Sequence, residues 1–109
     1  MMYVDFMAGG KEYKLRIATR AIVALEKKIG CNPLTIFGDG TTIPKITTMV
    51  DILHASLQQY HNGIDLNEAY DIYDEWVADG HVATDFVNII VEIYKVSGLI
   101  KNPNKEEKN

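Results

Sequence analysis

Apolar residues recur at steps of three and four positions between Lys45 and Tyr60, and this pattern constrains the fold more than any other feature of the chain. They are Ile46, Met49, Val50, Leu53, Leu57 and Tyr60, with Thr47, Asp51, Gln58 and Gln59 at the opposite positions. This spacing places one apolar stripe along a helix of 3.6 residues per turn. It predicts an amphipathic helix whose apolar face must be covered by other elements.

Turn and cap signals divide the rest of the chain. The segment Ala8-Gly9-Gly10-Lys11 separates two stretches of alternating residues, 3–7 and 12–17, and can supply the positive φ angles of a tight hairpin turn. Thr19 is the predicted N-cap of a first helix, and Asp65 with Glu68 forms a capping-box pattern. The predicted helices span residues 20–29, 45–60, 65–79 and 84–97, and one short helical turn follows Asn32. We therefore predict an α+β fold, mainly α, with an N-terminal β-hairpin followed by about four helices.

Length and composition fit one domain. The 109 residues are 47% hydrophobic, which is enough to bury a core. We expect a single domain over residues 1–100 and a polar, disordered tail over residues 101–109. Cys31 has no internal disulfide partner, and the chain shows neither a signal peptide nor the run of about 20 apolar residues that a membrane span needs. The composition predicts a soluble protein that suits a reducing cytoplasm.

Negative charge is concentrated in one segment. The formal net charge is −4, but residues 62–98 contain one Lys and eight Asp or Glu. Nucleic-acid binding depends on clustered Lys and Arg that neutralise phosphates. This segment would repel a duplex, so nucleic-acid binding is disfavoured.

The residue types that could carry catalysis or bind metal lack the required spacing. His54, His61 and His81 include no pair four residues apart, and there is no cysteine cluster or calcium-loop pattern. The sequence neighbours of Cys31 provide neither a base nor a cation, and the paired carboxylates lie on a polar stripe, away from any predicted cleft. We predict no enzyme activity, no cofactor and no metal site.

Two predicted helices carry candidate partner-binding residues. One stripe of the third helix is acidic and consists of Glu68, Asp71, Glu75 and Asp79. This stripe either faces solvent or docks a basic partner segment. Ile72 projects close to it, away from Tyr73 and Trp76, and is expected to be exposed.

The fourth helix is apolar around most of its circumference, with only Asn88, Glu92 and Lys95 as polar residues in its body. Such a helix is either central in the core or shared with a partner or a second copy. The candidate partner-binding residues are Ile72, Val87, Val91, Glu68, Asp71 and Glu75.

Several sequence blocks occur in an order shared with a known family. Residues 13–30 are followed by Asn32-Pro33-Leu34, and then come residues 52–60, 70–75 and 92–98. This order and spacing resembles the tail assembly chaperones of long-tailed (siphovirus-type) bacteriophages or prophages of Gram-positive bacteria. The likeness covers residues 3–100.

The resemblance implies a non-enzymatic protein of the host cell cytoplasm that is absent from the mature virion. Such chaperones bind the tape measure protein, keep it soluble and help recruit the major tail (tube) protein, and a homo-oligomer is compatible with this role. Two alternatives stay open. One is a small phage DNA-associated protein whose third and fourth helices form a helix-turn-helix, and the other is a structural tail connector subunit.

Overall fold

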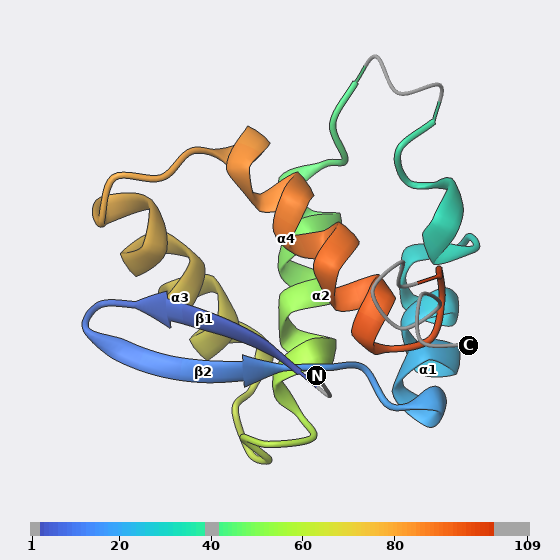
Figure 1. Ribbon diagram of the computed structural model, residues 1–109, viewed down its shortest axis with the longest axis horizontal. Coiled ribbons are helices and arrows are strands. Elements are labelled where there is room, and N and C mark those ends of the chain that lie inside the picture. Colours follow the sequence, from blue (N-terminus) through green and yellow to red (C-terminus); the bar gives the residue numbers. More distant parts are fainter. Residues whose placement is uncertain (1–2, 39–41, 102–109) are drawn as a thin grey trace.

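A computed structural model describes residues 3–38 and 42–101 of the chain (Figure 1). The elements are, in order, β1 (Val4–Ala8), β2 (Lys11–Leu15), α1 (Thr19–Ile29), the short 3-10 helix η1 (Pro33–Thr35), α2 (Ile46–Leu57), α3 (Leu66–Ala78) and α4 (Ala83–Val96). The predicted α+β architecture, mainly α, is confirmed. Residues 102–109 of the predicted tail lie outside the described residues.

The hairpin owes its register to two glycines. Gly9 and Gly10 have φ angles of 58° and 79°, which suit a two-residue turn between right-twisting strands. Ala8 therefore pairs with Lys11, and the antiparallel register continues to Val4 opposite Leu15. One face of the hairpin is buried, through Phe6, Ala8, Tyr13 and Leu15, while the alternate side chains face solvent.

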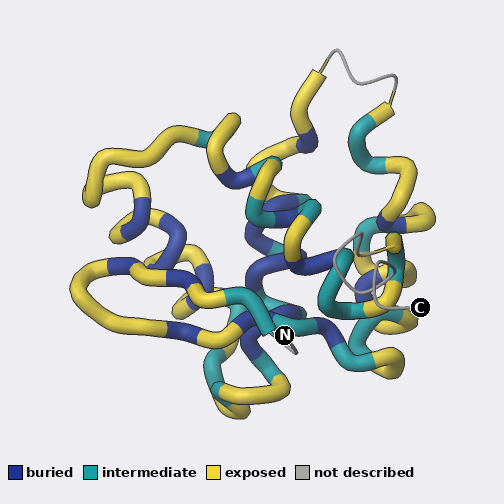
Figure 2. The backbone as a smooth tube through the Cα atoms, in the orientation of Figure 1, coloured by how far each residue is buried: buried dark blue, intermediate teal, exposed yellow. Residues whose placement is uncertain are grey.

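Helix α2 occupies the centre of the core. It packs against α1, α3, α4 and β2, and dark blue stretches mark its buried residues in the middle of Figure 2. Its fully buried residues are Met49, Val50, Ile52, Leu53, Ser56 and Leu57. Two residues of the predicted apolar stripe, Ile46 and Tyr60, are instead exposed, because one lies in the first turn of the helix and the other lies beyond its end.

The predicted cap of α1 is wrong by one residue. Thr19 is the first helical residue, and Ala18 occupies the N-cap position without any side-chain hydrogen bond. The predicted end is confirmed, since Gly30 adopts a left-handed conformation with φ 76°. Asn32 caps η1 as expected, because its Oδ1 accepts a hydrogen bond of 2.9 Å from the Leu34 amide.

The capping box of α3 is present in both directions. The Glu68 amide donates to Asp65 Oδ1 at 2.8 Å, and the Asp65 amide donates to Glu68 Oε1 at 3.0 Å. One buried carbonyl is satisfied by a contact distant in the sequence. The Tyr94 hydroxyl of α4 donates to the Pro33 carbonyl of η1 at 2.9 Å, within the core.

The segment between the hairpin and α1 is attached to the end of α4. Arg16 Nε donates to the Val96 carbonyl at 3.3 Å, and the Ile17 amide donates to Ser97 Oγ at 2.9 Å. Each of these bonds joins residues 80 positions apart in the sequence. The early and late parts of the described chain therefore meet in one place.

Candidate functional site

The expected exposure of Ile72 is wrong. Its side chain is only 6% exposed, whereas Tyr70 and Val77 of the same helix are 37% and 39% exposed. Helix α3 packs against both α2 and β1, so the hairpin covers the side of α3 next to its acidic stripe. The buried face is thus turned toward the hairpin. Ile72 cannot serve as an exposed partner-binding residue in this structure.

The acidic candidates of α3 lie beside the hairpin. Glu68 is engaged in the capping box of its own helix. A Cβ atom built on Gly9 would lie 3.0 Å from the Glu75 carboxylate, so this side chain contacts the hairpin turn. Asp79 Oδ2 accepts a hydrogen bond of 2.9 Å from the Gly9 amide. Of the predicted candidates, Asp71 is exposed without such a local contact in the described part of the chain.

Electrostatics agree with this arrangement. The pKa of Tyr13 is raised, first by burial of the phenol and then by the negative charges of Glu75 and Glu68. These carboxylates therefore lie near the buried face of β2. Ion pairs within the described residues join Lys28 to Asp51 and Lys95 to Glu92, and His81 Nδ1 lies 4.0 Å from Asp85 Oδ2. None of these contacts includes a carboxylate of α3.

Helix α4 is central along one face and accessible along its flanks. Phe86, Ile90, Ile93 and Tyr94 are fully buried, whereas the candidates Val87 and Val91 are half-buried. The helix packs against α2 and β1. The interpretation as a central core helix therefore holds for the buried face of α4. The flank that carries Val87 and Val91 keeps apolar surface accessible, as a helix shared with a partner would require.

An aromatic cluster, which the sequence patterns did not predict, joins β1, α3 and α4. Its members are Phe6, Tyr73, Trp76 and Phe86, with neighbouring ring centroids 5.4 to 6.0 Å apart. His81 stacks on Trp76 at 4.7 Å and 7°. The Tyr73 hydroxyl is buried and has no hydrogen-bond partner among the described residues. Only the spacing of aromatic residues on three separate elements could have suggested this cluster.

The histidines are placed apart, and one of them has a defined structural role. His61 Nε2 accepts a hydrogen bond of 2.9 Å from the Lys14 amide, and its ring packs edge-on against Tyr13. Burial, and then the charges of Lys14 and Lys11, lower the pKa of His61. Over residues 3–38 and 42–101, no group of three or more His, Cys, Asp or Glu side chains could hold a metal ion.

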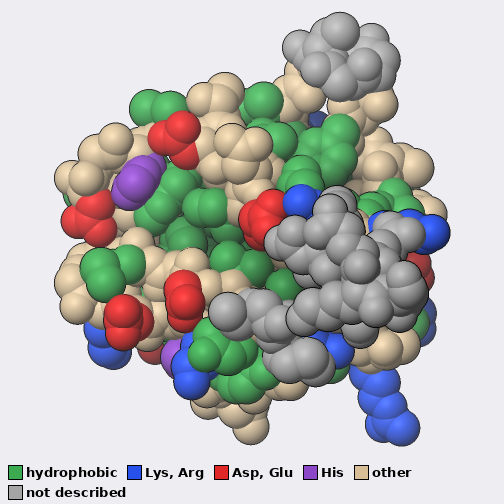
Figure 3. Space-filling model, in the orientation of Figure 1, with side chains coloured by type: hydrophobic (Ala, Val, Ile, Leu, Met, Phe, Trp, Pro, Cys, Tyr) green, Lys and Arg blue, Asp and Glu red, His purple; other side chains and the backbone are tan. Residues whose placement is uncertain are grey.

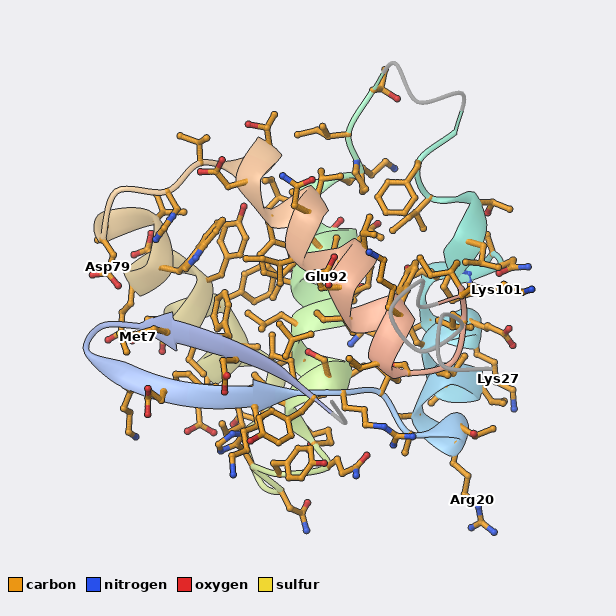
Figure 4. The ribbon with its side chains drawn as sticks, viewed as in Figure 1. Met7, Arg20, Lys27, Asp79, Glu92 and Lys101 are labelled. Carbon is orange, nitrogen blue, oxygen red and sulfur yellow. The ribbon has the colours of Figure 1, made fainter. Side chains whose placement is uncertain are left out.

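The molecular surface between β1 and α4 is apolar at its centre and acidic around its edge. In Figure 3, apolar side chains are exposed between β1 and α4, and acidic side chains surround them. In Figure 4, Met7 and Asp79 lie on one side of this region and Glu92 of α4 lies on the other. Arg20 and Lys27 of α1 lie at the opposite end of the molecule. Arg20 and Lys27 are thus distant from this acidic edge, whereas Lys95 pairs with Glu92 and Lys14 lies opposite Asp5 in the hairpin.

Comparison with known proteins gives the chain a family without giving it a function. No helix in the described part of the chain combines the length and the apolar character that crossing a membrane requires. No curated protein and no solved structure matches the chain. One family model, described as "Family of unknown function (DUF6096)", matches residues 4–109. Because this match covers nearly the whole sequence, the chain belongs to the DUF6096 family.

Proposed function

We propose that this protein is a non-enzymatic tail assembly chaperone that binds a tape measure protein, keeps it soluble and helps recruit tail tube subunits in the host cell cytoplasm. The first support is the order of sequence blocks between residues 13 and 98, which resembles that of tail assembly chaperones. The second support is the surface of α3 and α4, whose acidic and apolar side chains suit the binding of such a partner.

The observation that carries the proposal is the uncompensated charge of α3 and its C-cap. Five carboxylates lie there, and none forms an ion pair with a described residue: Glu68, Asp71, Asp74, Glu75 and Asp79. A concentration of one sign of charge attracts a partner of the opposite sign and raises the association rate. A basic segment is therefore the partner that this surface favours.

Exposed apolar side chains on α3 and α4 give such a segment something to bury. Tyr70 and Val77 are exposed on α3, and Val87 and Val91 are half-buried on α4. A long tape measure segment with apolar and basic residues would be shielded from aggregation while it contacts these side chains. Charge would bring the segment to the protein, and apolar contact would hold it.

Co-expression with the tape measure protein of the same genome tests the proposal. Asp71→Lys reverses one exposed charge that has no structural contact, and it should weaken the complex by about 1 kcal/mol, or about fivefold in Kd. The matched control is Glu26→Lys, an equal charge change on the exposed surface of α1. Val91→Asp should also weaken the complex, because it places a charge in the apolar flank of α4.

The soluble yield of the tape measure protein and its recovery with the tagged protein are the two readouts. Unchanged recovery with both Asp71→Lys and Val91→Asp would remove these surfaces from the interface. No recovery with the unmodified protein, together with a salt-dependent shift of duplex DNA, would favour the DNA-associated alternative. Detection of the protein in purified virions by mass spectrometry would favour a tail connector subunit.

A further inference from the structure

The two edges of the hairpin differ in how their backbone groups are satisfied. Ala8 and Lys11 flank a two-residue turn, so they form a hydrogen-bonded pair, and the pairs then alternate along the register. Met7 opposite Glu12 and Asp5 opposite Lys14 are therefore pairs whose amides and carbonyls point away from the partner strand. Each strand thus presents outward backbone groups along its own edge.

The edge of β2 is closed by groups distant in the sequence. The Lys14 amide donates to His61 Nε2 at 2.9 Å, and the Arg16 amide donates to the Ser56 carbonyl at 2.9 Å. These bonds satisfy successive outward amides and confirm the alternation derived from the turn. The β2 edge is protected against pairing with another strand at these two positions.

The edge of β1 carries no corresponding bonds. Within the described residues, the outward backbone groups of Asp5 and Met7 form no hydrogen bond. Both residues are exposed, and the Met7 side chain is 53% exposed. An open strand edge with free donors and acceptors is complementary to one kind of ligand, an extended polypeptide backbone.

The surroundings of this edge define the side chains of such a ligand. Side chains of an added strand alternate between two faces. One set would lie on the side of Phe6, whose ring contacts Trp76 of α3 and Phe86 of α4, where apolar surface is exposed (Figure 3). The other set would lie on the side of Asp5 and Met7.

Charge decides between a second copy of this chain and a different partner. Asp5 lies on the edge strand itself, and Glu75 and Asp79 contact the turn at Gly9. A second copy would bring the same acidic groups and the same net charge of −4 to the contact. A segment with Lys or Arg is complementary instead.

We propose that the free edge of β1 pairs with an extended segment of a partner protein in which apolar residues alternate with Lys or Arg. The pairing adds a third strand to the hairpin, with backbone hydrogen bonds at Asp5 and Met7. The inference goes beyond the proposed function, because it does not depend on which protein supplies the segment.

A synthetic peptide of about ten residues that alternates Val and Lys is the probe, and binding is measured by fluorescence anisotropy. Met7→Pro removes one outward amide while leaving the bonds between β1 and β2, since Met7 belongs to a pair that exchanges none. It should weaken peptide binding about tenfold, the equivalent of one lost hydrogen bond. Glu12→Pro is the matched control, because it removes the outward amide directly opposite, on the β2 edge, and should leave binding unchanged.

Amide exchange followed by NMR on the unmodified protein keeps the test independent of how these variants fold. The Asp5 and Met7 amides should exchange rapidly in the free protein and become protected when the peptide binds. A peptide whose amides are N-methylated along one edge should give no protection. Binding that leaves both amides unprotected, or equal losses for Met7→Pro and Glu12→Pro, would overturn the proposal. Protection in the protein alone at rising concentration would assign the edge to a second copy and would overturn it as well.

Discussion

Removing one hydroxyl group from each of two buried tyrosines should have different effects on stability. Tyr94 donates to the Pro33 carbonyl at 2.9 Å, whereas the Tyr73 hydroxyl has no partner among the described residues. Burial raises the pKa of both hydroxyls above the usual range, so both stay protonated at neutral pH. The change from Tyr to Phe is identical at the two positions, and only the hydrogen-bond partner differs.

The structure gives the expected sizes. Tyr94→Phe loses a buried hydrogen bond and leaves the Pro33 carbonyl without its donor, which should cost about 1 to 2 kcal/mol. For a domain of this size, that loss lowers Tm by about 5 to 10 °C. Tyr73→Phe removes a hydroxyl that was desolvated without compensation, so the free energy of unfolding should stay the same or rise by up to about 1 kcal/mol.

Urea denaturation followed by circular dichroism measures both variants against the unmodified protein. Equal m-values would show that each substitution changes stability and leaves the surface exposed on unfolding unchanged. The reasoning would be refuted if Tyr73→Phe lost as much stability as Tyr94→Phe, because the Tyr73 hydroxyl would then be engaged in a favourable interaction.

Three further substitutions or conditions test other parts of the fold. Folding lowers the pKa of His61, so the neutral imidazole stabilises the fold above pH 6.5, and this contribution is lost as the pH falls through the lower pKa of the folded state. The Tm should therefore fall on acidification, and it should fall less in His61→Gln. Asp65→Ala removes one side of the capping box and should cost about 1 kcal/mol in urea denaturation, against little change for the exposed Asp74→Ala. Ile72→Asp buries a charge and should cost at least about 3 kcal/mol, so a soluble variant with an unchanged Tm would contradict the burial of Ile72.

The features that the sequence predicted correctly depend on a few neighbouring residues. The Gly9-Gly10 turn, the capping box at Asp65 and Glu68, and the left-handed Gly30 are all set by local backbone geometry. Thr19 shows the limit of such signals, since the helix begins one residue earlier and uses no side-chain cap. Local chemistry therefore predicted the elements and most of their ends.

The features that the sequence did not predict depend on contacts between distant elements. Ile72 was misplaced because a helical projection contains no information about the hairpin, which packs against that side of α3. The protection of β2 depends on His61, 47 positions from Lys14, and the aromatic cluster draws on β1, α3 and α4. The charge and the apolar character of the candidate residues on α3 and α4 were thus predictable, and their arrangement in space was not.

The attachment of Arg16 and Ile17 to the last turn of α4 has a consequence for the newly made protein. The hairpin leaves the ribosome well before its neighbour α4 and before the acceptors at Val96 and Ser97, which follow 80 positions after Arg16 and Ile17. During synthesis the hairpin can pack against α2 and α3 first, but the part of its apolar face that packs against α4 stays uncovered until that helix has emerged. A chain truncated before Ser97 should therefore yield an aggregation-prone fragment.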